Sequence, residues 1–371
     1  MPASRWFSSS YSQAAGKFII ACDDLVALGH TLTTERLDLS MTGPEGEPLC
    51  IDVAIIGNPN AKKALLYSSG IHGVEGYPGS AIQLSVLDRL AKSQPFDNYA
   101  VIFVHIVNPF GMAWWRRFNE NNVDLNRNFL ASNKEYSGSP SGYHLVKDFI
   151  NPHSPPPRRE RWFKLKAFRL ILKYGYSNLK QWVAEGQYED ETAIQFGGFE
   201  FQPGPKLIYA WLDENLKGVE KIWAIDLHTG LGPSGHDTLL ISGDMDEIRI
   251  KELEAIFPNQ IERLDPVSGI GYRIDGNFHQ GLEDRFDKID WTSITQEFGT
   301  FKSIKVIRAN RAENRWTQWG NYAGQNEAKR HWSRQKLLRV FNPDNPVWQA
   351  KLIEKGNLVF AKAVENLLED N

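Results

Sequence analysis

Short apolar runs alternate along this chain with longer segments in which apolar residues recur every three or four positions. An apolar run of strand length predicts a buried strand, and the three-to-four-residue period predicts a helix with one buried face. The alternation of the two patterns predicts an α/β protein. We expect strands at residues 31–39, 49–56, 64–68, 100–107, 222–227, 238–241 and 291–297, and helices at residues 11–28, 78–90, 247–257, 311–330 and 346–368.

Two of the expected strands end in side chains that can bind a divalent metal. His72 and Glu75 follow the strand at residues 64–68, in a run whose glycines let the backbone turn sharply. Ligand sites gather at the ends of strands in α/β proteins, and an imidazole with a carboxylate suits zinc first. His228, at the end of a second apolar strand, is the best candidate for a third ligand. Three protein ligands leave one position for water, which is the arrangement of catalytic zinc.

A base is then needed beside the water, and Glu297 suits this role because it also ends a strand-like run. Glu283 and Asp284 are alternative candidates for the base, and His105 and His236 are alternative candidates for a metal ligand. His105 lies within an expected strand, where a hydrogen-bonded structural role is favoured. His236 lies in a glycine-rich loop.

These residues, taken with a second run at 119–129, form a pattern that resembles the zinc carboxypeptidase superfamily. The elements in order are His72 and Glu75, Asn108-Pro109-Phe110-Gly111, Arg117, Asp124-Leu125-Asn126-Arg127-Asn128-Phe129, His228 and Glu297. That superfamily also includes the aspartoacylase and succinylglutamate desuccinylase deacylases. The resemblance covers residues from about 65 to 300, and the run at 124–129 is its most specific part. It implies one globular domain over residues 1–371, with a mixed, mostly parallel twisted sheet flanked by helices.

The resemblance also implies a catalytic centre. His72, Glu75 and His228 would hold one Zn²⁺ per chain, which lowers the pKa of a bound water to about 7. Glu297 would take the proton of that water and pass it to the leaving amine. Arg117 would stabilise the developing oxyanion.

Four further residues receive roles around this centre. Asn126 and Arg127 would bind a substrate carboxylate, the arginine through its two-pronged fork. Asp124 would bond the far nitrogen of His72 and fix its tautomer. Tyr272, in a glycine-containing loop, is the candidate for a tyrosine that closes over the substrate.

Two assignments depend on neighbouring side chains. Arg116 and Arg117 are adjacent, so only one can face the metal, and Arg117 stands nine positions before Asn126, as in close relatives of the pattern. Asp226 would share a strand face with His228, because strand periodicity is two. It could orient the site or fill an ordinary polar role.

The motifs favour a metallocarboxypeptidase that cleaves an amide next to a free carboxylate. An N-acyl-amino-acid deacylase uses the same residues and is the close alternative, so the expected substrate is a peptide or an N-acyl amino acid. Two histidines and a carboxylate also occur in non-haem iron oxygenases. A catalytically silent relative that binds peptide or zinc is a further alternative, although such a protein has no need of Glu297.

Residues 151–205 depart from a compact family core and are expected to be an insertion. They begin with a proline-rich turn at 152–157, and residues 158–173 then mix seven basic with many apolar side chains. The apolar stripe of such a helix can pack on the core while the basic stems reach water, or it can meet a membrane or an acidic partner. In either case the insertion could wall the cleft and limit the size of the substrate.

Composition adds few restrictions. The 371 residues are 42% hydrophobic and 23% charged, with a net charge of -3 and no long block of like charge, which argues against nucleic acid as a partner. Cys22 and Cys50 make no disulfide framework and predict buried thiols in a reducing compartment. No stretch approaches the roughly 20 apolar residues needed to cross a membrane, and residues 18–22 are too short for a signal segment. The expected location is therefore cytoplasmic.

Overall fold

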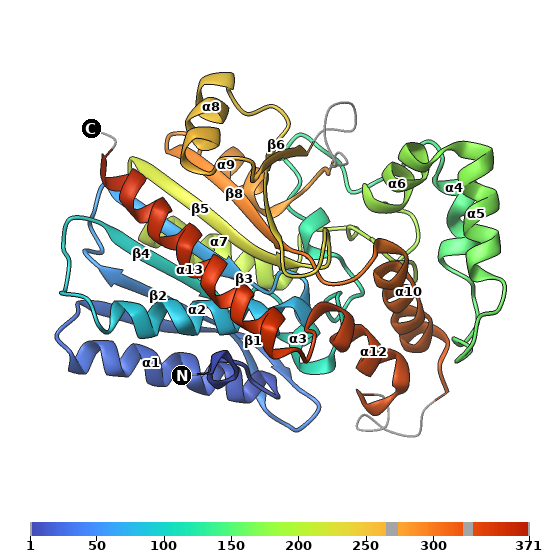
Figure 1. The fold of residues 1–371 in the computed structure, drawn as a ribbon, viewed down its shortest axis with the longest axis horizontal. Coiled ribbons are helices and arrows are strands. Elements are labelled where there is room, and N and C mark those ends of the chain that lie inside the picture. The colour runs from blue at the N-terminus through green and yellow to red at the C-terminus, as the bar shows by residue number, and fades with distance from the viewer. Residues whose placement is uncertain (1, 265–273, 322–328, 370–371) are drawn as a thin grey trace.

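The structure is a computed structural model that describes residues 2–264, 274–321 and 329–369. Within these residues one eight-stranded mixed sheet runs in the order β1-β2-β4-β3-β5-β8-β6-β7 (Figure 1). Its central strands, from β4 to β8, pair in parallel. The expected α/β fold with a mixed, mostly parallel sheet is therefore confirmed. The strands are β1 Leu32–Thr42, β2 Pro48–Gly57, β3 Lys63–Ser69, β4 Ala100–His105, β5 Lys221–Thr229, β6 Asp237–Ser242, β7 Ile261–Leu264 and β8 Asp290–Phe298.

Helices cover both faces of the sheet (Figure 1). The α-helices are α1 Tyr11–Ala27, α2 Gly76–Leu90, α3 Pro109–Trp114, α4 Tyr143–Ile150, α5 Phe163–Tyr174, α6 Tyr176–Ala184, α7 Pro203–Asn215, α8 Glu247–Ile256, α9 Phe278–Arg285, α10 Ser303–Trp319, α12 Trp332–Phe341 and α13 Pro346–Glu369. The described part of the chain also contains the short 3-10 helices η1 Ala3–Arg5, η2 Gly73–Glu75 and η3 Leu125–Arg127.

The central strands read as continuous apolar runs because each face of the sheet has its own core. On β3, Leu65 and Tyr67 point into the core that contains side chains of α1, α2 and α13. Ala64 and Leu66, one residue out of phase, enter the opposite core with side chains of α7 and α9. This two-sided burial holds the ends of the central strands in fixed positions.

The helix expected at residues 311–330 is wrong at both ends. The observed α10 is Ser303–Trp319, and residues 322–328 lie outside the described part of the chain. Polar residues occupy buried positions of this helix, so its apolar periodicity is weak. Arg311 and Glu313 are both buried, and each is paired with an opposite charge.

Helices α4, α5 and α6 form a group beside the sheet, next to α10 (Figure 1). On α5, Phe163 and Ala167 are buried, whereas Leu165, Phe168 and Leu172 are exposed. The apolar stripe expected to pack on the core therefore does so along only part of its surface. We retain as a proposal that residues 151–205 are an insertion in a single catalytic domain.

The two cysteines, Cys22 and Cys50, are both buried and unpaired. Among the described helices, none combines the length and the apolar character that a membrane crossing requires.

A close backbone approach beside the loop that carries His72 and Glu75 leads to a stability prediction. A Cβ atom on Gly73 would lie 2.1 Å from the carbonyl carbon of Gly111, so Gly73→Ala forces two backbones apart. We expect this variant to lose about 1–3 kcal/mol of unfolding free energy. A Cβ atom on Gly16, inside α1, would meet no other atom within 4 Å, and Gly16→Ala is expected to add about 0.5–1 kcal/mol. Urea denaturation of both variants checks the pair, and equal stability of Gly73→Ala and wild type would contradict the packing argument.

Candidate active site

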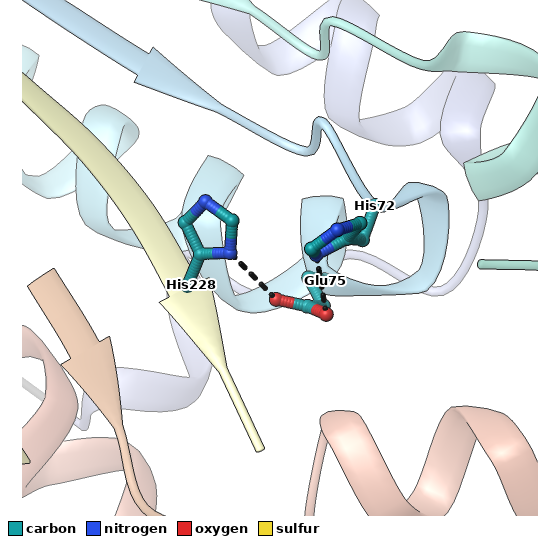
Figure 2. A group of neighbouring side chains, drawn as sticks. All are labelled: His72, Glu75 and His228. Carbon is teal, nitrogen blue, oxygen red and sulfur yellow. Dashed lines mark ion pairs between the residues drawn. The ribbon is translucent and has the colours of Figure 1, made fainter. Parts of the chain in front are cut away.

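The ends of two neighbouring strands bring together three groups that can hold a metal ion. β3 and β5 are adjacent and parallel, so their carboxyl ends meet at one edge of the sheet. His72 and Glu75 follow β3, and His228 lies near the end of β5. One ligand atom from each of these residues lies within 4.8 Å of the other two, and all three residues are buried. Figure 2 shows the Glu75 carboxylate in ion pairs with both imidazole rings.

The loop after β3 is shaped by backbone contacts with the Asn-Pro-x-Gly turn. Gly70 has a φ of 72°, in the left-handed region that glycine adopts without steric cost. The main-chain N–H of Asn108 donates to the carbonyl oxygen of Gly70. The side-chain amide of Asn108 donates to the carbonyl oxygen of Arg117. The N–H of Gly73 donates to the same Arg117 oxygen. The motif therefore fixes the metal loop and the arginine relative to each other.

Both histidines present the same nitrogen to the carboxylate between them. Nδ1 of His72 lies 3.0 Å from Oε1 of Glu75, and Nδ1 of His228 lies 3.6 Å from Oε2. The opposite nitrogen, Nε2, lies 3.1 Å from Asp124 in His72 and 2.5 Å from Asp226 in His228. An aspartate at Nε2 keeps the proton there and leaves the Nδ1 lone pair for a metal.

The nitrogens and oxygens present fit a divalent cation such as Zn²⁺. Nδ1 of His72 is buried and faces the Glu75 carboxylate at 3.0 Å without the geometry of a hydrogen bond, as expected of two ligands of one metal. Nε2 of the same ring also lies 2.6 Å from Nη2 of Arg117, so a ring with a bare Nε2 could accept a hydrogen bond there. A cation at Nδ1 would select the tautomer that donates to Asp124. Two imidazoles and a carboxylate are the ligand set of known catalytic zinc sites.

The electrostatic field at this place favours positive charge. Burial alone would lower the pKa of His228, but Asp226, Glu75 and Glu297 outweigh it and raise that pKa to about 9. Burial alone would likewise raise the pKa of Asp124, yet the charges of Arg117 and His72 hold it well below its usual range. Asp124, Asp226 and Glu75 all have lowered pKa values and therefore remain ionised, which is the environment a divalent cation requires.

Glu297 lies beside the three groups on the next strand. β8 pairs in parallel with β5, and Glu297 stands opposite His228 in the register. Its Oε1 accepts a hydrogen bond of 2.9 Å from the N–H of Leu231. Burial, and then the charge of Glu75, raises the pKa of Glu297 to about 8. The rivals Glu283 and Asp284 lie on α9, and neither lines the cavity at the site.

Of the two adjacent arginines, Arg117 faces the candidate metal-binding residues. Its Nη1 donates to Oε1 of Glu75 at 2.9 Å, and its Nε donates to Asp124 at 3.3 Å. Arg116 points away and pairs with Glu313 of α10 at 3.0 Å. The position of Arg117 agrees with the choice made from spacing.

The guanidinium of Arg127, which is expected to bind a substrate carboxylate, already binds a main-chain oxygen. Nε and Nη2 of Arg127 donate to the carbonyl oxygen of Ala184, at 3.1 and 2.5 Å. Ala184 is the last residue of α6, in the proposed insertion. Asn126 lines the same cavity, and its Oδ1 accepts from the N–H of Phe278 at 3.0 Å. A substrate carboxylate would therefore compete with Ala184 for the guanidinium. Tyr272 lies outside the described residues.

A cavity of about 620 Å³ opens onto these groups. His72, Glu75, His228 and Glu297 line one part of it. Side chains of α4, α5, α6 and α10 line another part, and most of the wall is apolar. The site therefore has a polar reacting end and an extended apolar space.

Comparison with known sequences assigns a family. The chain matches, over residues 7–355, the model of the family described as protein of unknown function, DUF2817. The chain belongs to this family. A comparison with curated proteins returned no match.

Solved structures similar to this DUF2817 chain include a fibrinolysis inhibitor, a carboxypeptidase and an amidase. Bovine thrombin-activatable fibrinolysis inhibitor, in complex with tick carboxypeptidase inhibitor, is 13% identical with a TM-score of 0.47, covering 98% of both chains. Carboxypeptidase A from Helicoverpa armigera has the same identity and TM-score, covering 95% of this chain and 74% of that one. Murein-tripeptide amidase MpaA from Escherichia coli O157 is 17% identical with a TM-score of 0.36, covering 77% and 92%. These structures show what the chain is similar to, and the function is argued below from the site itself.

Sequence reasoning left one residue of this DUF2817 site open and missed another. The two-residue period of a strand predicted that Asp226 and His228 share a face. In the structure Asp226 is the hydrogen-bond partner of the His228 ring. His279, on α9, also lines the cavity, and burial lowers its pKa to about 4. It follows no strand and belongs to no recognisable motif, so no sequence signal identified it. The rival His105 is buried against Ser80, and His236 is exposed.

Asp226 gives a prediction about metal affinity. Its Oδ2 accepts from His228 and its Oδ1 from Ser68 at 2.7 Å, so it fixes the orientation of the ring. We expect Asp226→Asn to weaken metal binding by about 10–100-fold, as is typical for partners of metal-binding histidines. Competition with a fluorescent chelator measures the change. Asp290→Asn, on an exposed residue at the start of β8, is the control and should leave affinity unaltered. Equal affinities in the two variants would contradict the orienting role.

Proposed function

We propose that this protein is a metal-dependent amide hydrolase of the carboxypeptidase type, with one Zn²⁺ per chain held by His72, Glu75 and His228. The observation that carries the proposal is the convergence of these three buried groups, with Glu297 beside them, at the ends of three neighbouring parallel strands. Two imidazoles and a carboxylate leave room for water, and a carboxylate adjacent to that water can take its proton.

Each residue then has a task in hydrolysis. A bound divalent cation supplies Lewis acidity and lowers the pKa of a water molecule towards 7. Glu297 takes a proton from the attacking water and returns it to the amine that leaves. Arg117, held by Glu75 and Asp124, offers positive charge to the developing oxyanion.

Asn126 and Arg127 are proposed to receive the substrate carboxylate. The fork of Arg127 already binds a main-chain oxygen, so it is directed at an acceptor inside the cavity region. A carboxylate is the stronger acceptor, because it forms charge-assisted hydrogen bonds with both prongs. Substrate binding would therefore exchange the Ala184 carbonyl for the substrate, with an adjustment at the end of α6.

Glu297 also separates this proposal from the two other classes of function. A non-haem iron oxygenase uses two histidines and a carboxylate but does not require a buried carboxylate base beside them. A silent binding protein has no use for Glu297 either. The two buried, unpaired cysteines agree with the proposed cytoplasmic location.

A second candidate is the hydrolysis of N-acyl amino acids by the same residues. The apolar wall of the cavity favours it, because the whole cavity, reacting end included, is larger than one amino-acid side chain requires. Both candidates share the metal, the base and the carboxylate clamp, and they differ in what lies on the other side of the amide.

Metal content measured together with an activity screen tests the proposal. Elemental analysis of the purified protein should find about one zinc per chain. The screen comprises peptides with a free C-terminus, the same peptides with a blocked C-terminus, and N-acyl amino acids. Cleavage of free but not blocked peptides supports the carboxypeptidase, and cleavage of N-acyl amino acids alone supports the deacylase. Absence of bound metal, even after zinc is supplied, would refute the site.

A further inference from the structure

The apolar part of the cavity indicates which kind of amide the site accepts. The cavity of about 620 Å³ continues from the metal ligands to the space between α10 and the helix group α4, α5 and α6. Apolar side chains that line this part include Phe149, Ile150, Ala167, Ile171, Val183 and Ile307. We call this part of the cavity the acyl chamber. Helix α4 directly precedes the proposed insertion, and α5 and α6 lie within it.

Lys164 and Lys302 lie at the rim of the acyl chamber, and Lys180 of α6 lines it half-buried. Lys164 and Lys302 line the cavity and are exposed, so their aliphatic stems can cover its edge while the ammonium groups reach water. Phe168 and Tyr176 also line the cavity, yet they are 56% and 60% exposed. The entrance is therefore formed by partly exposed aromatic rings and the stems of lysines, which is a surface that an apolar ligand would cover.

A hydrocarbon chain matches this chamber better than a peptide does. Each peptide unit placed against an apolar wall leaves an N–H and a C=O without partners, at a cost of about 1–3 kcal/mol for each group. A hydrocarbon chain brings no such groups and gains the transfer free energy of every methylene that leaves water. A cavity of this volume also accommodates a drug-sized ligand, far larger than one side chain.

We propose that the acyl chamber binds a long, unbranched acyl chain, so that the substrate is a long-chain N-acyl amino acid. This inference rests on the proposed function and specifies its substrate. In the reaction the oxygen of water bonds to the acyl carbon and the carbon–nitrogen bond breaks. One proton of the water ends on the amine, and the products are a fatty acid and a free amino acid.

Two substitutions on α5 provide a matched test. Ala167 lines the chamber and is buried, so Ala167→Trp should fill it. Leu172 lies on the same helix, 71% exposed and outside the cavity lining, so Leu172→Trp adds the same ring where no chain is bound. Thermal unfolding identifies any variant that fails to fold, and Ile171→Trp, also in the lining, then replaces Ala167→Trp.

The first measurement is binding to the metal-free protein, which requires no catalysis. Isothermal calorimetry with butanoate, octanoate and dodecanoate should show affinity rising by about fourfold for each added methylene until the chamber is full. Ala167→Trp should weaken dodecanoate binding at least about tenfold, and Leu172→Trp should not alter it. Failure to bind dodecanoate, or an equal effect of both variants, overturns the acyl chamber whether or not amides are hydrolysed.

The second measurement is hydrolysis by the zinc-loaded protein of acetyl, octanoyl and dodecanoyl derivatives of every common amino acid. We expect kcat/KM to rise with chain length, and Ala167→Trp to lower the ratio of dodecanoyl to acetyl hydrolysis at least about tenfold. Cleavage of peptides or acetyl amino acids in preference to long chains overturns the inference and leaves the proposed function intact. No hydrolysis of any amide by protein that holds zinc overturns both.

Discussion

His72→Ala is expected to lose the bound metal and to reduce amide hydrolysis by more than about 10³-fold, because changing even a partner of a metal ligand typically costs about 10–100-fold. Nδ1 of His72 is buried, lacks a hydrogen-bond partner and faces Glu75, so a cation there has no substitute ligand. Elemental analysis should find about one zinc per chain in the wild type and almost none in the variant. Initial rates at equal protein concentration measure the loss of activity.

Thermal unfolding separates loss of the metal from loss of the fold in this experiment. A ligand that binds only the folded protein raises the Tm, so zinc should stabilise the wild type and leave His72→Ala unchanged. After chelation the two proteins should unfold at similar temperatures. His236→Ala, on an exposed histidine, is the control and should keep both zinc and activity. Retention of zinc by His72→Ala would contradict its role as a ligand.

The parts of this site that were predictable from the sequence are those encoded by short local patterns. Apolar runs located the strands β3, β5 and β8, and the site residues follow from where those runs end. The structure adds that the three strands are neighbours and parallel, and this order brings His72, His228 and Glu297 together at one edge of the sheet. The period of two along β5 likewise brought Asp226 to the same face as His228.

The features that escaped prediction depend on contacts between distant segments. Nothing local in residues 124–129 indicates that the guanidinium of Arg127 binds the carbonyl of Ala184, because that contact joins η3 to the end of α6. Burial that depends on ion pairs is also hidden from the sequence: Arg311 of α10 is buried against Glu160, which lies in a distant loop. Periodicity detects apolar burial, and it cannot detect burial that depends on an ion pair.

Glu297→Gln is expected to keep the metal and lower kcat by about 10²–10⁴-fold, the usual contribution of a general base. The amide oxygen of glutamine can still accept the hydrogen bond from Leu231, so the side chain should keep its place. The amide cannot take a proton from water, however, and this is the step assigned to Glu297. Zinc content, kcat and KM are measured together, and the loss should fall on kcat because Glu297 is not assigned to binding the substrate.

Glu283→Gln is the matched control for this prediction. Glu283 is the rival base in the sequence, but it lies on α9 and outside the cavity lining. Burial raises the pKa of Glu283, as it does that of Glu297, so the two residues are alike in the direction of this shift and differ in position. If position decides, Glu283→Gln keeps its activity while Glu297→Gln loses it. Full activity in Glu297→Gln would remove the base from the proposed reaction and leave the hydrolase without a proton acceptor beside the metal ligands.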